Sequence, residues 1–138
     1  MKIRARAEFK PVSFEGFERK IQPAIIAAVK QGTNVVVGEA MVLVHVDSGD
    51  LMDTIRGEVA AWTGFVVKGW IIAGNETVNY AAFNEFGTGI RGASSAGAGP
   101  YAYNMEWPGM VAIPFMRPAL DNSRDRILAA FTAHGFKT

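Results

Sequence analysis

The chain has 138 residues, a formal net charge of +1 at pH 7 and no cysteine. This length suits one compact domain, which we expect to span residues 1–138, and the small charge excludes a global field that would hold a polyanion. Hydrophobic residues make up 49% and charged residues 20% of the chain, against about 45–50% and about 25% in typical globular domains, so disorder throughout is excluded.

The lack of cysteine excludes disulfides, thiolate metal sites and cysteine nucleophiles, and it fits assembly in a reducing compartment. The first residues do not contain the apolar core of a signal peptide, and no run approaches about 18 uninterrupted apolar residues. Neither export by a cleaved signal nor a membrane span is therefore indicated.

Charged and apolar side chains alternate over residues 2–10, which predicts a strand with one basic and one apolar face, ended by Pro11. Ser13 can then cap a short helix over residues 14–20. The basic face is the one patch suited to non-specific DNA contact, although a plain solvent-exposed face explains it as well. Its members are Lys2, Arg4, Arg6 and Lys10.

Pro23 suits the first turn of a second helix, because its missing N–H would be unpaired there. Apolar residues at spacings of three and four predict that this helix is long and ends near Val46. Gly32 and Gly38 weaken it by roughly 1 kcal/mol each relative to alanine. Each therefore needs a packing reason, such as the close approach of another element.

The next segments predict a helical turn and a hairpin. Asp47 or Ser48 can cap a short helix over residues 51–55. Two apolar segments, 56–62 and 65–73, are rich in β-branched and aromatic residues and predict an antiparallel hairpin around Thr63-Gly64, with Gly74-Asn75 as the following turn.

The last third of the chain predicts a helical piece, a loop and a helix. "YAAFNEF", residues 80–86, can form two helical turns, and residues 87–109 form a flexible glycine-rich insertion loop. A helix follows the prolines of residues 114–118, with its apolar side formed by Phe115, Ala119 or Leu120, Ile127, Leu128 and Phe131. The fold class is α+β, with a small antiparallel sheet packed against a long N-terminal helix and a C-terminal helix.

Two sequence patterns are similar to those of ligand sites. Gly87, Gly89 and Gly92 have the spacing G-x-G-x-x-G, but no helix can extend far after them and no acidic residue follows in a βαβ context, so a flexible loop is favoured over a nucleotide site. A second cluster could suggest a metal site, yet it contains a single histidine, and turn formation explains the same residues. It comprises His45, Asp47, Asp50 and Asp53. We predict no cofactor and no metal.

Glu39 and Glu85 are the carboxylates that we expect to be partly buried, because the first lies in the apolar stripe and the second between aromatic residues. Such a pair can do acid–base work, but structural partners are the favoured interpretation. Arg117 and Asp121 have i,i+4 spacing and predict a weak ion pair on the last helix. We predict no catalytic residue and no enzyme.

Three stretches in this order carry a family resemblance: "HVDSGDLMDTI" at 45–55, "YAAFNEFGTG" at 80–89 and "PFMRPALDNSRDRI" at 114–127. Preceded by a long amphipathic helix, they resemble the neck and tail-completion proteins of long-tailed bacteriophages, the family typified by gene product ten of phage HK-ninety-seven. The match covers about residues 14–131. The longer run from Thr88 to Pro114 departs from the family pattern.

The resemblance implies structural roles for the motif residues, as caps, turns and core anchors. It leads us to expect that Phe86 and Phe115 are buried and that Glu85 pairs with Arg117. The motif residues are Asp47, Gly49, Leu51, Tyr80, Glu85, Phe86, Gly87, Pro114, Phe115, Arg117 and Pro118.

The resemblance also implies a structural virion protein, assembled in the host cytoplasm, that forms a homohexameric ring around the DNA channel in the head-to-tail neck. Expected partners are head-closure or connector proteins, tail-tube or tail-terminator proteins, and packaged DNA by non-specific contact; no membrane contact is expected. A tail terminator capping the tail tube is the alternative, and a nucleotide- or DNA-binding enzyme is less favoured. Further interface candidates are Arg91, Tyr101, Tyr103 and Trp107.

Overall fold

The computed structural model describes residues 14–60, 66–88 and 109–137. The predicted N-terminal strand, the turn at Thr63-Gly64 and residues 89–108 of the predicted loop lie outside this part of the chain. The same holds for the interface candidates Lys2, Arg4, Arg6, Lys10, Arg91, Tyr101, Tyr103 and Trp107.

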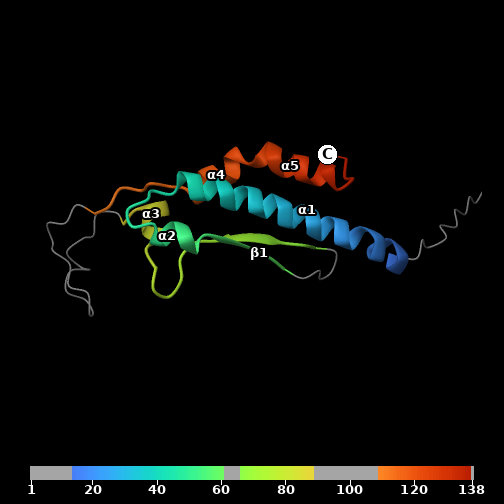
Figure 1. Cartoon of the computed structure of the whole chain (residues 1–138), viewed down its shortest axis with the longest axis horizontal. Helices are drawn as coiled ribbons and strands as arrows, with labels where there is room; N and C mark the ends of the chain where they lie inside the picture. The colour runs from blue at the N-terminus through green and yellow to red at the C-terminus, as the bar shows by residue number, and fades with distance from the viewer. Residues whose placement is uncertain (1–13, 61–65, 89–108, 138) are drawn as a thin grey trace, which may run out of the picture.

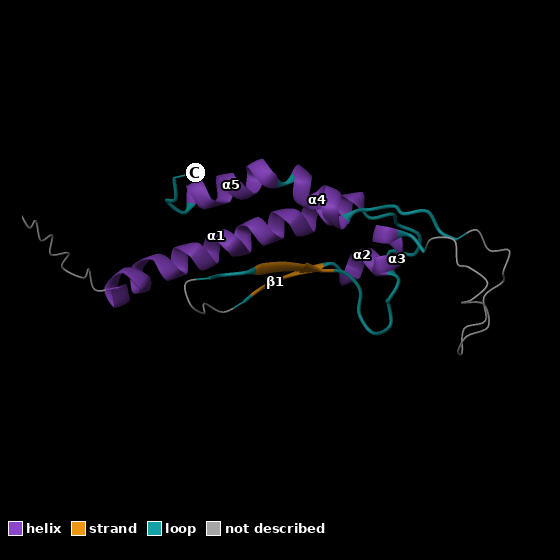
Figure 2. Ribbon diagram, turned by 180° about the vertical axis from the view of Figure 1, so that it is seen from behind, coloured by secondary structure: helices purple, strands orange, loops and turns teal. Residues whose placement is uncertain are grey.

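The central element is α1 (Phe14–Leu43), a helix of 30 residues. Figure 1 shows the C-terminal helices along one side of α1 and a hairpin along the opposite side, and Figure 2 shows the same three layers from behind. The helices are α4 (Met116–Asn122) and α5 (Arg124–Ala133), and the strands are β1 (Arg56–Val59) and β2 (Gly69–Ile72). The predicted α+β fold is confirmed.

The predicted break at Pro23 is wrong, because α1 runs continuously from Phe14 with this proline inside it. An internal proline removes one backbone hydrogen bond and costs a helix about 3 kcal/mol. Further along the same helix Ala28, Val36 and Ala40 are buried, and packing of this kind routinely overrides local propensity. The helix ends at Leu43, slightly before the predicted end.

The two helical glycines differ in their surroundings. A Cβ atom on Gly32 would lie 3.4 Å from Cγ2 of Ile127, so α5 approaches α1 closely at this position, as expected. A Cβ atom on Gly38 would meet nothing within 4 Å. The packing reason expected for Gly38 is therefore wrong, and that of Gly32 is confirmed.

The hairpin is antiparallel, with Arg56 opposite Ile72 and Val59 opposite Gly69. The predicted pairing is confirmed, although both strands are shorter than expected. The face turned to α1 carries Gly57 and Gly69, and a Cβ atom on Gly57 would lie 2.5 Å from Cγ2 of Thr33. A Cβ atom on Gly69 would collide with the Thr33 hydroxyl. The two glycines thus allow the sheet to lie directly on the helix.

Thr33 is held in this contact by its own hydrogen bond. Its hydroxyl donates to the Val29 carbonyl at 2.8 Å, and its residue is only 6% exposed. Because the side chain is β-branched and bonded, it has little freedom to rotate away. The distance between α1 and the hairpin is therefore fixed by Thr33 and the glycines opposite it.

A short helix, α2 (Asp50–Thr54), follows α1, and a second, α3 (Ala81–Phe86), follows the hairpin. Gly49 rather than Asp47 or Ser48 is the N-cap of α2, with φ of 89°, because the turn before α2 requires a left-handed residue. Ser48 still contributes, since its hydroxyl accepts the Asp50 N–H at 3.4 Å.

The predicted turn at Gly74-Asn75 is confirmed. Gly74 has φ of 92°, and the Asn75 N–H donates to the Val78 carbonyl at 2.8 Å. The Asn75 side-chain oxygen also accepts the N–H groups of Thr77 and Val78. The two helical turns predicted over "YAAFNEF" correspond to α3.

The C-terminal helix is divided at Ser123, which is fully buried and separates α4 from α5. The expectation of one continuous helix is therefore wrong. Because the helix is divided, Ala119 and Ala130 are the buried residues of its two parts, whereas Leu120 and Leu128 are 48% and 50% exposed. The Ser123 hydroxyl at this break accepts a hydrogen bond from Nη2 of Arg126 at 3.3 Å.

We predict that Gly57→Ala lowers the free energy of unfolding by about 1–3 kcal/mol, because the added methyl group overpacks the contact with Thr33. Gly38→Ala is the matched control and should raise it by about 0.5–1 kcal/mol, since its site is open and alanine favours helix. Urea unfolding followed by circular dichroism measures both. Equal responses of the two variants would contradict the role of the glycine contact.

Candidate functional site

The three stretches that carry the family resemblance meet at the C-terminal end of α1. Figure 1 shows α2, α3 and the start of α4 gathered there. We call this region the junction and define it as residues 44–55, 80–88 and 109–119. Its shared core is formed by Val44, Leu51, Ile55, Ala81, Phe115 and Ala119. Each stretch thus contributes at least one buried side chain to the same cluster.

Glu85 connects α3 to the start of α4. Its Oε2 accepts the backbone N–H groups of Phe115 at 2.8 Å and Met116 at 2.9 Å, and its Oε1 accepts the N–H of Arg117 at 3.0 Å. The first N–H groups of a helix have no partner within the helix, so this carboxylate satisfies donors that would otherwise be unpaired. Glu85 therefore caps α4 from a distant part of the chain.

The expected ion pair between Glu85 and the Arg117 guanidinium is wrong in its chemistry. Within the described residues, no ion pair within 4.0 Å involves Arg117, and Glu85 instead bonds to its backbone N–H. Burial alone would raise the pKa of Glu85. The three N–H groups, with the nearby charge of Arg117, outweigh burial and hold the pKa below its usual value.

The second stretch also clamps the backbone that returns at Gly109. The Thr88 hydroxyl accepts the Met110 N–H at 2.7 Å, and the Thr88 N–H donates to the Met110 carbonyl at 3.0 Å. A Cβ atom on Gly87 would lie 2.6 Å from the Met110 carbonyl oxygen, and Gly87 has φ of 68°. The glycine at the start of the G-x-G-x-x-G pattern is thus used for close backbone packing; Gly89 and Gly92 lie outside the described residues.

The two motif phenylalanines have opposite environments. Phe115 is fully buried, as expected, whereas Phe86 is 72% exposed and its predicted burial is wrong. Phe86 is the last residue of α3, while Ala81 at the start of that helix faces the core. Among the other motif residues, Leu51 is buried, Gly49, Gly87 and Pro118 are half-buried, and the exposed ones are Asp47, Tyr80, Pro114 and Arg117.

Glu39 also acts as a structural acceptor. Its carboxylate accepts hydrogen bonds from Nη2 of Arg126 at 2.6 Å and from Nδ2 of Asn122 at 3.2 Å. These bonds join α1 to the C-terminal helices. The hydrogen bond from Arg126 is the main cause of a lowered pKa at Glu39. Asp121 pairs with Arg124 at 3.2 Å, so the predicted pair of Asp121 with Arg117 is wrong.

The residues around His45 contribute to a hollow of about 320 Å³ beside α2 and α3. Its lining includes His45, Asp47 and Tyr80 together with apolar side chains such as Ile113. Over residues 14–60, 66–88 and 109–137, no three histidine or carboxylate side chains gather where they could hold a metal ion. In the same residues, no helix has the length and apolar character needed to cross a bilayer.

The junction exposes large apolar side chains that the sequence did not indicate. Phe86 is 72% exposed, and Val111 and Ile113 in the adjacent segment are 83% and 45% exposed. The available signal was the apolar run "MVAI" at 110–113, which has no period and therefore assigns no side chain to the core.

Comparison of the chain with protein-family models, with curated proteins and with solved structures finds no match.

We predict that Glu85→Ala lowers the free energy of unfolding by about 1–2 kcal/mol, because it leaves N–H groups at the start of α4 without their acceptor. Arg117→Ala should change it by at most about 0.5 kcal/mol, since Arg117 is exposed and takes part in none of the ion pairs between described residues. Urea unfolding measures both variants. A loss of stability for Arg117→Ala larger than this prediction would support an ion pair between the side chains of Glu85 and Arg117.

The Glu85 cap should also depend on pH. Because folding lowers its pKa, the stabilisation is complete well above the unfolded value of 4.5 and disappears as the pH falls through the lower folded value. The stability difference between the wild-type chain and Glu85→Gln should therefore be largest near pH 7 and shrink below about pH 4.5. Urea titrations at pH 7, 5 and 3 test this, and a difference that is constant with pH would contradict it.

Proposed function

We propose that this protein is a structural virion protein of a long-tailed bacteriophage, which forms a ring in the head-to-tail neck around the DNA channel. The proposal begins from the resemblance of three ordered stretches to neck and tail-completion proteins. It is supported by the use of those stretches within the chain, where Glu85, Thr88 and Phe115 cap, clamp and fill the junction. Structural roles of this kind are those that the resemblance implies for the motif residues.

The observation that carries the proposal is the exposure of large apolar side chains on neighbouring segments of the junction. Such side chains scattered singly are normal on a soluble protein, whereas a group of them supports a contact with another macromolecule. Phe86 and Val111 belong to neighbouring segments, because the Ile113 N–H donates to the Asn84 carbonyl at 2.7 Å beside them. Burial of such side chains between identical subunits would close a ring.

Two measurements test the assembly. Native mass spectrometry of the purified chain, alone and mixed with connector or tail proteins, should give a closed oligomer. Immunogold labelling of purified virions should place the protein at the neck. A protein found in lysate and never in particles would overturn the proposal, and label at the far end of an isolated tail tube would favour the tail terminator.

We predict that Phe86→Ser shifts the oligomer towards monomer and changes the free energy of unfolding by no more than about 0.5 kcal/mol, because the side chain is 72% exposed. Lys137→Ser changes an exposed residue at the C-terminal end of the described chain, outside the junction, and is the control. Light scattering gives the mass and urea unfolding gives the stability. An unchanged mass would show that Phe86 lies outside the interface.

A further inference from the structure

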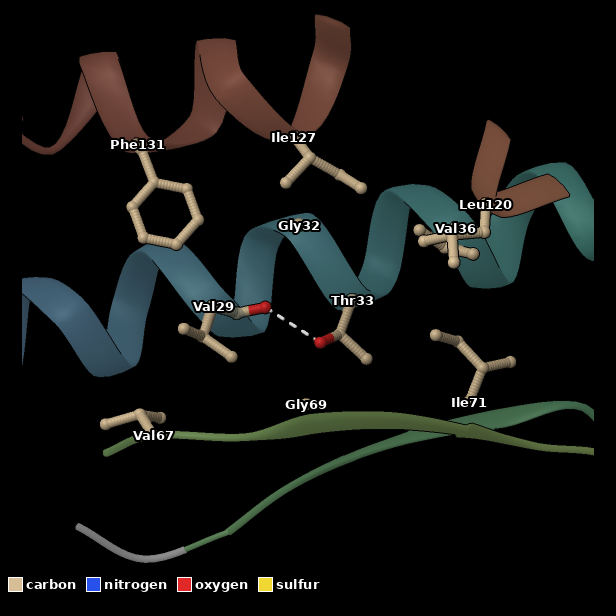
Figure 3. Close-up of a pocket in the computed structure, with 10 residues that line it drawn as sticks. All are labelled: Val29, Gly32, Thr33, Val36, Val67, Gly69, Ile71, Leu120, Ile127 and Phe131. Carbon is tan, nitrogen blue, oxygen red and sulfur yellow. Dashed lines mark hydrogen bonds between the residues drawn. The ribbon is translucent and has the colours of Figure 1, made fainter. Parts of the chain in front are cut away.

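An open apolar cleft lies along the flank of α1, between β2 and the C-terminal helices. It encloses about 220 Å³. Figure 3 shows α1 between the two walls, with the hairpin on one side and the last helices on the other. The apolar lining residues include Val29 and Val36 from α1, Val67 and Ile71 from the hairpin, and Leu120 and Phe131 from the other wall.

The wall formed by the hairpin is a strand edge that pairs with no other backbone segment among the described residues. The Ala60 N–H donates to the Lys68 carbonyl at 2.8 Å, so Lys68 and every second residue after it direct their backbone groups to β1. The alternate residues Val67, Gly69 and Ile71 direct theirs away from β1. In the described part of the chain, no backbone hydrogen bond outside the hairpin ladder involves these three.

The two edges of the hairpin differ in their surroundings. Beside β1, Lys30 and Asn34 of α1 flank the strand together with Gly57 and Val59. Beside β2, the neighbouring side chains are almost all apolar. An added strand with one apolar face would therefore bury that face only at the β2 edge, and a two-stranded sheet gains stability from a third strand.

Residues 2–10 have the pattern that this edge requires. Ile3, Ala5, Ala7 and Phe9 alternate with charged residues, so a strand formed by them would direct four apolar side chains to the cleft and its charges to water. Backbone pairing with a free edge would supply affinity, and the alternate side chains would supply specificity.

The length of the chain favours a neighbouring subunit as the source of this strand. Lys10 is four residues from Phe14, a reach of about 14 Å at full extension. Val29, at the start of the cleft, lies about 22 Å along α1 from Phe14. Phe9 and Lys10 therefore cannot reach the cleft of their own subunit. Figure 1 also shows the first turns of α1 extending past both the hairpin and α5.

We propose that residues 2–10 of one copy add as a third strand to the β2 edge of a second copy, with their apolar face in its cleft. This inference rests on the ring proposed above and names a contact that would link its subunits. The strand leaves one subunit at the projecting end of α1 and enters the flank of the next. Such a head-to-tail contact uses two different surfaces and can be repeated around a closed ring.

Disulfide trapping tests the strand addition directly, because the natural chain contains no cysteine. The double variant Ala5→Cys with Val67→Cys places both thiols on the cleft side, and Ala5→Cys with Val66→Cys is the control, since Val66 is 52% exposed and its position alternates with Val67. After oxidation with copper phenanthroline, non-reducing gels should show a ladder of covalent multimers for the first variant and at least fivefold less for the control.

The outcomes separate the two proposals. Light scattering of the unoxidised sample reports whether a ring forms at all. A ring without the covalent ladder overturns the strand addition and leaves the ring standing, whereas a chain that stays monomeric without the ladder, both alone and mixed with connector or tail proteins, overturns both. A fast-migrating cross-linked monomer shows that the strand binds its own subunit, which also overturns the exchange.

A second pair of variants tests the apolar face without cysteine. Ala5→Gln with Ala7→Gln should reduce the oligomeric fraction at least fivefold, because polar side chains would face the cleft. Glu8→Gln introduces the same side chain on the other face and should leave the fraction unchanged. Equal effects of the two sets of substitutions would overturn the proposed orientation of the strand.

Discussion

The contact between Thr33 and the two glycines of the hairpin is the constraint on which the rest of the structure depends. The Thr33 side chain occupies the space that Cβ atoms on Gly57 and Gly69 would need, so the sheet rests on the helix at backbone distance. On the opposite side, Gly32 lets α5 approach the same turn of α1. One short stretch of helix therefore serves two layers, and this arrangement requires a helix that is apolar on opposite faces.

The carboxylates Glu39 and Glu85 complete this arrangement from two points. Glu39 holds the C-terminal helices beside α1 through Arg126, and Glu85 fixes where those helices begin. The pKa of each carboxyl group is lowered by the groups it bonds to. Their effect is to set the relative positions of segments that are far apart in the sequence.

Much of the fold could be predicted because its signals are local. The hairpin, the turn at Gly74 and the helical turns of "YAAFNEF" follow from composition and periodicity. The errors at Pro23 and Ser123 arise where tertiary packing determines whether a helix continues or breaks. The site was harder, since nothing local indicates that Glu85 caps a helix through backbone groups, or that Phe86 at the end of α3 faces water.

The paired hydrogen bonds between Thr88 and Met110 have a consequence for how the protein can vary. They join the two points where the described chain leaves and re-enters the junction, so Thr88 and Met110 hold these two points together. Because doubling the length of a flexible loop costs only about 0.6 kcal/mol, a connection anchored in this way can change in length at little cost in stability. It is the natural place for a peptide tag or a small inserted domain, and the part of the chain where diversity between relatives would be cheapest to acquire.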